Sequence, residues 1–300
     1  MPTVARFNVT PLKSSSLHHP GEIELGAGGV PGDRRFLILH ADGRRLSGAE
    51  KAPFLGIRAD HEDGRLSLRF PDGAALGAEA VPDGDAYAVA LYDREVLVRD
   101  VPGPFGEALS AHAGLEVRLA RVEEPEYAGG RRRVSLISLA SVRDVGRRGG
   151  LEDAPDPRRF RMLIELEGDE PYEEDGWSGA LVRLGGAGVR VGDRMPRCVL
   201  TTLDPDTGRA DFPALDVLAT YRRSGTELQL GVYANVETPG RVRVGDSVEV
   251  CQTPKSSVAS SSSVAMSSSG NRSAIGSKTS PLVCCTSIIP WRRNAWPSAR

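Results

Sequence analysis

Residues 197–208 read Arg-Cys-Val-Leu-Thr-Thr-Leu-Asp-Pro-Asp-Thr-Gly. Residues 199–203 are β-branched or apolar, which predicts a strand over residues 198–203, and residues 204–208 have the composition of a tight turn. Cys198 is the only cysteine among the first 250 residues. An arginine beside a thiol favours the thiolate, which is both a nucleophile and a soft-metal ligand, whereas a free cysteine is more often a small buried hydrophobe. Both interpretations of Cys198 are open at this point.

Turn signals divide the first 120 residues into short strands. The pairs Asp42-Gly43, Asp63-Gly64 and Asp72-Gly73 lie between apolar or alternating runs, which is typical of antiparallel hairpins. The first helix is expected over residues 105–113, ended by Gly114. Residues 1–120 therefore predict an antiparallel β module.

A second β-rich segment follows over residues 121–251. Strands are expected at residues 134–137, 160–166, 181–184, 189–191 and 198–203. Short helices are expected at residues 138–145 and 213–221, the second capped by Asp211, and residues 232–236 and 242–250 are expected to pair as a closing hairpin. The whole pattern predicts a mainly β protein with a few short helices, built as one or two small barrels.

Composition excludes several classes of partner. The 300 residues carry a formal net charge of −2, which argues against a nucleic-acid binder because phosphate affinity rests on a clustered positive excess. No apolar run approaches the length that spans a bilayer, and the N-terminus lacks the pattern of a secretory signal, so we expect no membrane segment. One cysteine in 250 residues fits the reducing cytoplasm, where we expect the protein to be located.

The last part of the chain differs from the rest. Residues 252–300 contain no Asp or Glu, and serine dominates residues 256–280, so the sequence predicts a disordered tail that is not native to the domain. Arginine greatly outnumbers lysine, and only Lys13 and Lys51 precede this tail. Such scarcity draws attention to both of these lysines.

The pattern Arg-Cys-x-x-Thr-Thr-x-Asp-Pro-x-Thr-Gly over residues 197–208 resembles the signature of MOSC domains, named for the C-terminal domain of molybdenum cofactor sulfurase. The resemblance implies an N-terminal β-barrel domain over residues 1–120 and a MOSC β-barrel domain over residues 121–251. In the molybdenum-binding members, which include the mitochondrial amidoxime-reducing component and its bacterial relatives, the cysteine of this motif ligates molybdenum. The resemblance therefore implies that Cys198 is the metal ligand and the catalytic residue.

Three further motifs resemble the family's binding site for the phosphate of the pterin cofactor. Pro11-Leu12-Lys13-Ser14 resembles its Pro-x-Lys-Ser motif, Asp33-Arg34 resembles its Asp-Arg pair, and Arg161 matches the arginine of its Phe-Arg-Pro-Asn motif. Lysine supplies a point charge, serine a donor and arginine a bidentate fork, all suited to a phosphate monoester. Without the resemblance, a solvated loop lysine and a surface ion pair would explain the first two motifs. The third departs from the pattern, because Met162 and Leu163 replace proline and asparagine.

The remaining candidates are weaker signals. Arg197 and Thr201 belong to the cysteine motif itself and are expected to bind the cofactor, as is Tyr233, which matches the tyrosine of the family's Phe-Gly-x-Tyr motif, although a barrel tyrosine is more often core. Residues 174–177 match the family's Glu-Asp-x-Trp motif, whose expected role is structural. Trp177 is expected to pack in the barrel and the two carboxylates to pair with arginines.

Three functions remain open. The resemblance implies a molybdenum cofactor oxidoreductase that reduces small N-oxygenated (N-hydroxylated) compounds. The chain has no cysteine cluster for iron–sulfur and no dinucleotide fingerprint, so its electrons would come from a separate ferredoxin, cytochrome or flavin reductase type of protein. The second function is a carrier whose Cys198 takes up sulfur as a persulfide from a pyridoxal-phosphate (PLP) desulfurase partner. The third is a non-catalytic MOSC barrel.

Overall fold

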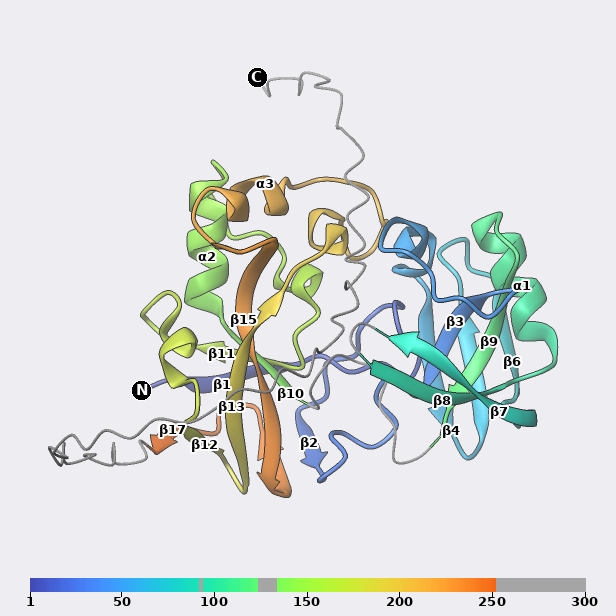
Figure 1. Ribbon diagram of the computed structural model, residues 1–300, viewed down its shortest axis with the longest axis horizontal. Coiled ribbons are helices and arrows are strands. Elements are labelled where there is room, and N and C mark those ends of the chain that lie inside the picture. Colours follow the sequence, from blue (N-terminus) through green and yellow to red (C-terminus); the bar gives the residue numbers. More distant parts are fainter. Residues whose placement is uncertain (92–93, 124–133, 252–300) are drawn as a thin grey trace, which may run out of the picture. The chain divides into compact units, whose positions relative to one another are not determined.

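A computed structural model describes residues 1–91, 94–123 and 134–251. These residues lie in one compact unit, Met1–Pro254. The unit is mainly β with a few short helices, which confirms the predicted fold class (Figure 1). The predicted tail, residues 252–300, lies outside the described residues.

The largest sheet has eight strands and is nearly closed into a barrel. Its strand order is β1 (Thr3–Phe7), β11 (Ile164–Glu167), β10 (Val134–Ser138), β15 (Glu227–Thr238), β13 (Ala187–Pro196), β12 (Leu181–Leu184) and β17 (Val248–Cys251), with β14 (Arg223–Ser224) paired to β15. The pair β10–β11 is parallel, and the other pairs of this sheet are antiparallel. A core of Val, Leu, Ile, Phe and Trp side chains fills one face of the sheet and includes Trp177, as predicted.

Three smaller sheets come mostly from the first half of the chain. One follows the order β3 (Phe36–His40), β9 (Val117–Val122), β8 (Arg94–Asp100) and β7 (Asp83–Leu91); a second is β4 (Arg58–Glu62), β5 (Arg65–Arg69) and β6 (Ala75–Glu79); the third pairs β2 (Glu22–Leu25) with β16 (Gly240–Arg243). The turns at Asp63-Gly64 and Asp72-Gly73 join β4 to β5 and β5 to β6, so two of the three predicted hairpins are confirmed. The hairpin predicted at Asp42-Gly43 is wrong, because β3 pairs with β9 and the turn there is closed by an isolated bridge between Leu39 and Arg45.

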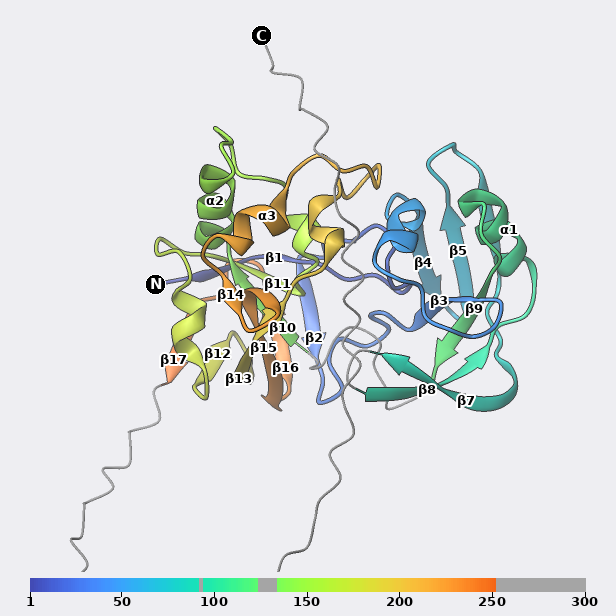
Figure 2. The same ribbon diagram turned by 45° about the horizontal axis from the view of Figure 1, so that its top comes forward.

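All three predicted helices are present, and two of them have the ends that local chemistry favours. Helix α1 (Pro104–Ala113) ends at Gly114, whose φ of 63° is the left-handed conformation that glycine favours. Helix α2 (Leu139–Arg148) follows Ser138, whose side chain accepts a hydrogen bond from the Ala140 amide, and it continues beyond the predicted end. Helix α3 (Ala214–Ala219) lies beside α2 in Figures 1 and 2 and is shorter than predicted. The prediction that Asp211 caps this helix is wrong, because the Asp211 carboxylate pairs with Arg159.

Four 3-10 helices complete the described elements, and one of them corrects a prediction. They are η1 (Ala49–Phe54), η2 (Pro157–Phe160), η3 (Glu173–Trp177) and η4 (Val199–Thr202). The strand predicted over residues 198–203 is therefore wrong. The hydroxyls of Thr201 and Thr202 donate to the carbonyls of Cys198 and Val199, three residues back, at 2.9 and 2.7 Å. Such side-chain bonds stabilise a turn against an extended strand.

The closing hairpin predicted from residues 232–236 and 242–250 is also wrong. Strand β16 pairs with β2 and strand β17 with β12, so neither pairs with β15. Strands β1 and β2, from the start of the chain, therefore pair with strands that lie beyond residue 160, β11 and β16. The predicted domains over residues 1–120 and 121–251 stay a prediction. In the part of the chain described, no helix is long and apolar enough to cross a membrane.

Candidate functional site

Cys198 is exposed and directly precedes η4. The turn that follows is organised by Asp204, whose carboxylate accepts hydrogen bonds from the Asp206 amide, the Thr207 amide and the Thr207 hydroxyl at 2.7–3.1 Å. The predicted tight turn over residues 204–208 is thus confirmed. Its side chains hold the backbone of the turn, and the thiol of Cys198 is left exposed.

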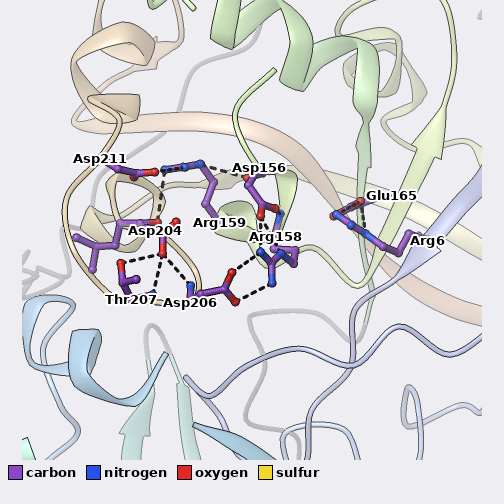
Figure 3. A network of polar contacts seen from close by, with 10 residues as sticks. Arg6, Asp156, Arg158, Arg159, Glu165, Asp204, Asp206, Thr207 and Asp211 are labelled. Carbon is purple, nitrogen blue, oxygen red and sulfur yellow. Dashed lines mark hydrogen bonds and ion pairs between the residues drawn. The ribbon is translucent and has the colours of Figure 1, made fainter. Parts of the chain in front are cut away.

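Two arginines of η2 fasten this turn, as Figure 3 shows. Arg158 donates to the carboxylates of Asp156 and Asp206 at distances of 2.6–2.9 Å. Arg159 pairs with Asp211 through two bonds of 2.8 and 2.9 Å, and its side chain is only 3% exposed. The hydrogen bonds to Asp206 and then to Asp156 raise the pKa of Arg158. The loop before Arg161 is therefore tied to the loop after Cys198.

The same turn packs closely against η1 and the residues after it. A Cβ atom added to Gly208, whose φ is 67°, would lie within 3.0 Å of the Ala52 carbonyl oxygen. A Cβ atom on Gly56 would meet the Asp206 carbonyl at a similarly forbidden distance, and one on Gly48 would lie 2.7 Å from Val199 Cγ1. Only glycine permits such close approach of two backbones. Residues 48–56 and 199–208 therefore lie side by side.

Two of the predicted phosphate-binding residues, Arg34 and Arg161, are joined by hydrogen bonds to each other and to the residue after Ser14. Arg161 Nη2 donates to the Ser15 carbonyl at 2.7 Å, and Arg34 Nη2 donates to the Arg161 carbonyl at 3.2 Å. Asp33 pairs with Arg34 and accepts from the Thr10 amide at 2.9 Å. Asp33 thus orients Arg34, and residues distant in sequence form one cluster.

Positive charge is concentrated in this cluster. Burial lowers the pKa of Lys13 well below its ordinary value of 10.5, and the nearby charges of Lys51, Arg34, Arg161 and Arg94 lower it further. Four other cationic side chains therefore act on Lys13 within a partly desolvated site. Such an arrangement is typical of a site that binds an anion.

Backbone strain falls on the same residues. Among the described residues, five other than glycine have a positive φ, and three of the five are Ser14 (75°), Arg34 (51°) and Arg161 (53°). The left-handed conformation is unfavourable for such residues and persists only where the surrounding structure enforces it. Strain of this kind is typical of functional sites, because it fixes side chains in place before a ligand arrives.

Two cations of the site had no motif to identify them. Lys51 and Arg45 line a small pocket together with Lys13 and Ser14. The only sequence signal for Lys51 was the scarcity of lysine in the first 251 residues. Arg45 stood among many other arginines and gave no signal.

Three other predicted residues contact the protein itself. The guanidinium of Arg197 donates to the carbonyls of Phe160 and Leu230 at 2.6–2.9 Å and contacts Met162 Sδ, and burial lowers its pKa to about 10. Its hydrogen bonds hold the backbone. Thr201 donates its hydroxyl to the Cys198 carbonyl, and Tyr233 lies buried in β15. That these three bind a cofactor stays a prediction.

The two residues that depart from the family pattern are core residues. Met162 and Leu163 are 0% and 1% exposed and pack in two separate hydrophobic clusters. A cofactor beside Arg161 would gain no polar contact from either side chain. The loss of the family's asparagine is therefore not compensated at its own position.

The Glu174-Asp175 pair separates into two roles. Asp175 pairs with Arg222 and Arg194, as predicted for both carboxylates. Glu174 instead accepts from the Ser141 hydroxyl at 2.9 and 3.1 Å and from the Ser138 amide, and burial raises its pKa to about 7. Both carboxylates are structural in this arrangement, because they fix η3 against α2 and the segment that leads into β14.

The chemistry of these groups suits a phosphate held near a soft metal. Lys13, Ser14, Arg34 and Arg161 supply point charge, hydroxyl and planar forks, which are the donors that phosphate prefers. The exposed thiol of Cys198 supplies one soft ligand. The residues present therefore fit the pterin cofactor that the family resemblance implies.

Comparison with known proteins identifies the family of domain that this chain contains. The family model of the MOSC domain matches residues 105–249. The chain therefore carries a MOSC domain.

Over a longer span the chain is similar to named relatives. It is 28% identical to mitochondrial amidoxime reducing component 2 of Homo sapiens over 287 residues, covering 82% of each protein. It is 25% identical to mitochondrial amidoxime-reducing component 1 of Mus musculus over 280 residues, covering 82% of this chain and 81% of that protein. A solved structure, the YuaD protein from Bacillus subtilis, aligns with a TM-score of 0.42 and 13% identity over 83% of this chain and 96% of that one.

Proposed function

We propose that this protein is a molybdenum cofactor oxidoreductase that reduces N-oxygenated compounds with electrons from a separate redox protein. The observation that carries the proposal is the convergence of Lys13, Ser14, Arg34 and Arg161 beside the loop that presents Cys198. The names of the relatives, amidoxime-reducing components aligned over 82% of this chain, support reduction of an N–O bond in general.

Each residue has a defined part in this proposal. Lys13, Ser14 and Arg34 bind the cofactor's phosphate, and Arg161 links that phosphate site to the loop before β11. Cys198 is the protein's ligand to the metal. When bound, the cofactor supplies a molybdenum centre that exchanges two electrons with the substrate. Reduction of N–OH to N–H also consumes two protons and releases water, so the site must remain open to solvent.

The protein's own contribution is mainly positioning. The Arg158 and Arg159 ion pairs tie the loop before Arg161 to the loop after Cys198. In this proposal the thiol and the phosphate site bind the same ligand. The electron donor is a separate protein of the ferredoxin, cytochrome or flavin reductase type. This sequence contains no iron–sulfur cysteine motif and no dinucleotide-binding motif that would hold a second redox group. A cytoplasmic location, predicted from the cysteine content, remains a prediction.

The sulfur carrier is the second candidate, because an exposed thiol at Cys198 would also serve a persulfide delivered by a PLP-dependent desulfurase. The two candidates differ in what they require of Lys13 and Arg34. A carrier needs an accessible thiol alone, whereas a reductase needs the phosphate site as well.

The test is to purify the full chain and its Cys198→Ser variant from a host that makes the cofactor. We expect near one molybdenum per wild-type chain and reduction of an aromatic amidoxime with chemically reduced viologen as donor, and loss of that activity in Cys198→Ser. The swap changes little volume at an exposed position, so the melting temperature should be nearly unchanged. Full activity in the serine variant would refute the metal-ligand assignment. A wild-type chain that lacks molybdenum but carries one extra sulfur by mass would favour the carrier.

A further inference from the structure

Lys51 lies between the two parts of the candidate site, the cluster of phosphate-binding residues and the loop that carries Cys198. It belongs to η1, and the glycine contacts described above place η1 beside η4, which follows Cys198. It also lines the small pocket that contains Lys13 and Ser14. Lys51 is thus the described residue that adjoins both the phosphate site and the thiol.

Among the described residues, the ammonium group of Lys51 has no protein partner that explains its position. Within residues 1–91, 94–123 and 134–251, its side chain makes no hydrogen bond or ion pair, although the residue is only partly exposed. The carboxylate of Glu50, its neighbour in sequence, contacts His40 and the Ser47 amide instead. A partly desolvated ammonium without a partner is costly unless a ligand supplies one.

The electrostatic surroundings agree with this geometry. Burial lowers the pKa of Lys51, the charge of Cys198 opposes that shift, and the charges of Arg45 and Arg161 add to it. The side chain of Cys198 therefore lies near enough to Lys51 to interact with it. Cations converge here from η1, the turn that follows β3 and the loop after η2, and together they favour an anion.

We propose that Lys51 is an anion-binding residue of this site, which holds a phosphate or carboxylate group of the ligand next to Cys198. The inference rests on the proposed function only in placing that ligand at Cys198. The anionic group has two possible sources. It belongs either to the cofactor, as its phosphate, or to the substrate, as a carboxylate carried beside the N–O group.

The first experiment measures anion binding without any reaction. Inorganic phosphate is titrated by calorimetry, at constant ionic strength, into the full chain purified from a host that cannot make the cofactor. We compare wild type with Lys51→Met, Lys51→Arg and Arg183→Met, the last being an exposed cation on β12 that serves as a matched control. Loss of one charge-assisted contact should weaken binding about tenfold or more in Lys51→Met. Lys51→Arg should retain most of the affinity, and Arg183→Met all of it.

The second experiment identifies the source of the anion in cofactor-loaded protein. If the source is the cofactor, Lys51→Met should purify with less pterin and less molybdenum per chain than wild type. If the source is the substrate, metal content should be kept, and the ratio of kcat/KM for a carboxylated over an uncharged aromatic amidoxime should fall towards one. This ratio compares two substrates on the same preparation, so partial loading does not change it.

Three results would overturn the inference. The first is phosphate binding by Lys51→Met that equals binding by wild type, and the second is no phosphate binding by wild type. The third is a loaded Lys51→Met variant with unchanged pterin content and unchanged substrate preference. Failure of the proposed function gives a different result, namely no N–O reduction by a fully loaded wild type, and it leaves the phosphate titration intact as a test of Lys51.

Discussion

Gly208→Ala tests whether the turn over residues 204–208 holds the cysteine loop against η1. The φ of Gly208 is 67°, a conformation that costs an L-residue about 1–2 kcal/mol. The new Cβ would also lie within 3.0 Å of the Ala52 carbonyl oxygen, which is backbone and cannot rotate away. Overpacking of this kind costs roughly 1–3 kcal/mol. The two effects together predict a loss of about 2–5 kcal/mol in the free energy of unfolding.

Two other glycines separate the strain from the clash. Gly225 has a φ of 57°, and a Cβ added there would have no atom within 4 Å, so Gly225→Ala measures strain alone. Gly56 has no left-handed φ, but a Cβ there meets the Asp206 carbonyl, so Gly56→Ala measures the clash alone. Gly208→Ala should therefore lose more stability than either, by roughly 1–3 kcal/mol over Gly225→Ala.

Urea unfolding followed by circular dichroism gives the three free-energy changes, and metal analysis of the same preparations gives molybdenum per chain. We expect molybdenum to fall in Gly208→Ala and Gly56→Ala, since both displace the loop that presents Cys198, and to be kept in Gly225→Ala. Equal stability losses in Gly208→Ala and Gly225→Ala would refute the close packing of the turn against Ala52. So would full molybdenum content in Gly208→Ala.

Two further predictions concern charge. Lys13→Met and Arg34→Met should each lower molybdenum per chain, and the double variant should purify largely without cofactor. The reason is that each charge-assisted phosphate bond contributes roughly 1.5–3 kcal/mol to binding. Undiminished molybdenum in the double variant would place the phosphate elsewhere. Burial raises the pKa of Glu174 from its ordinary 4.5 to about 7, so between these pH values the folded chain holds a proton that the unfolded chain has released, and stability falls as pH rises through this window. Glu174→Gln removes a penalty of at most about 3 kcal/mol above pH 7 and should raise the melting temperature more at pH 8 than at pH 5; an equal rise at both would contradict it.

The sequence predicted those helices and hairpins whose ends are fixed by a capping or turn residue within the same segment. The end of helix α1 was predicted because Gly114 supplies the cap within the sequence itself. The hairpins at Asp63-Gly64 and Asp72-Gly73 were predicted for the same reason. Residues 199–203 were mispredicted because β-branched composition favours a strand, whereas two threonine hydroxyls bonded to their own backbone favour a 3-10 turn.

Long-range pairing could not be predicted in this way. Strand β16 pairs with β2, near the other end of the chain, and no turn signal joins two such distant segments. The same limit applied to Arg197. Its place in the sequence beside Cys198 indicated a charge that activates the thiol, but its guanidinium holds the carbonyls of Phe160 and Leu230, which are neighbours only in the folded protein.

The sequence predicted those residues of the candidate site that belong to a recognisable motif. The family resemblance selected Lys13, Ser14, Arg34 and Arg161, and hydrogen bonds bring Arg34, Arg161 and Ser15 together. Lys51 lay outside any motif, and its relation to Cys198 depends on glycines that allow η1 and the cysteine turn to touch. A residue that reaches a site through close backbone packing leaves no spacing pattern in the sequence.

The strain at Ser14, Arg34 and Arg161 has a physical reason in the charge of the site. Like charges brought together in a partly desolvated space repel, so flexible loops would move apart and lose the site. A left-handed backbone costs of order 1–3 kcal/mol at each residue, and it persists where hydrogen bonds over-determine it. The Arg34 amide donates to the Thr10 carbonyl at 2.6 Å, and the Arg161 side chain donates to the Ser15 carbonyl at 2.7 Å. The fold therefore uses backbone and hydrogen-bond energy to keep the cations converged, which is what the anion site that we propose between them requires.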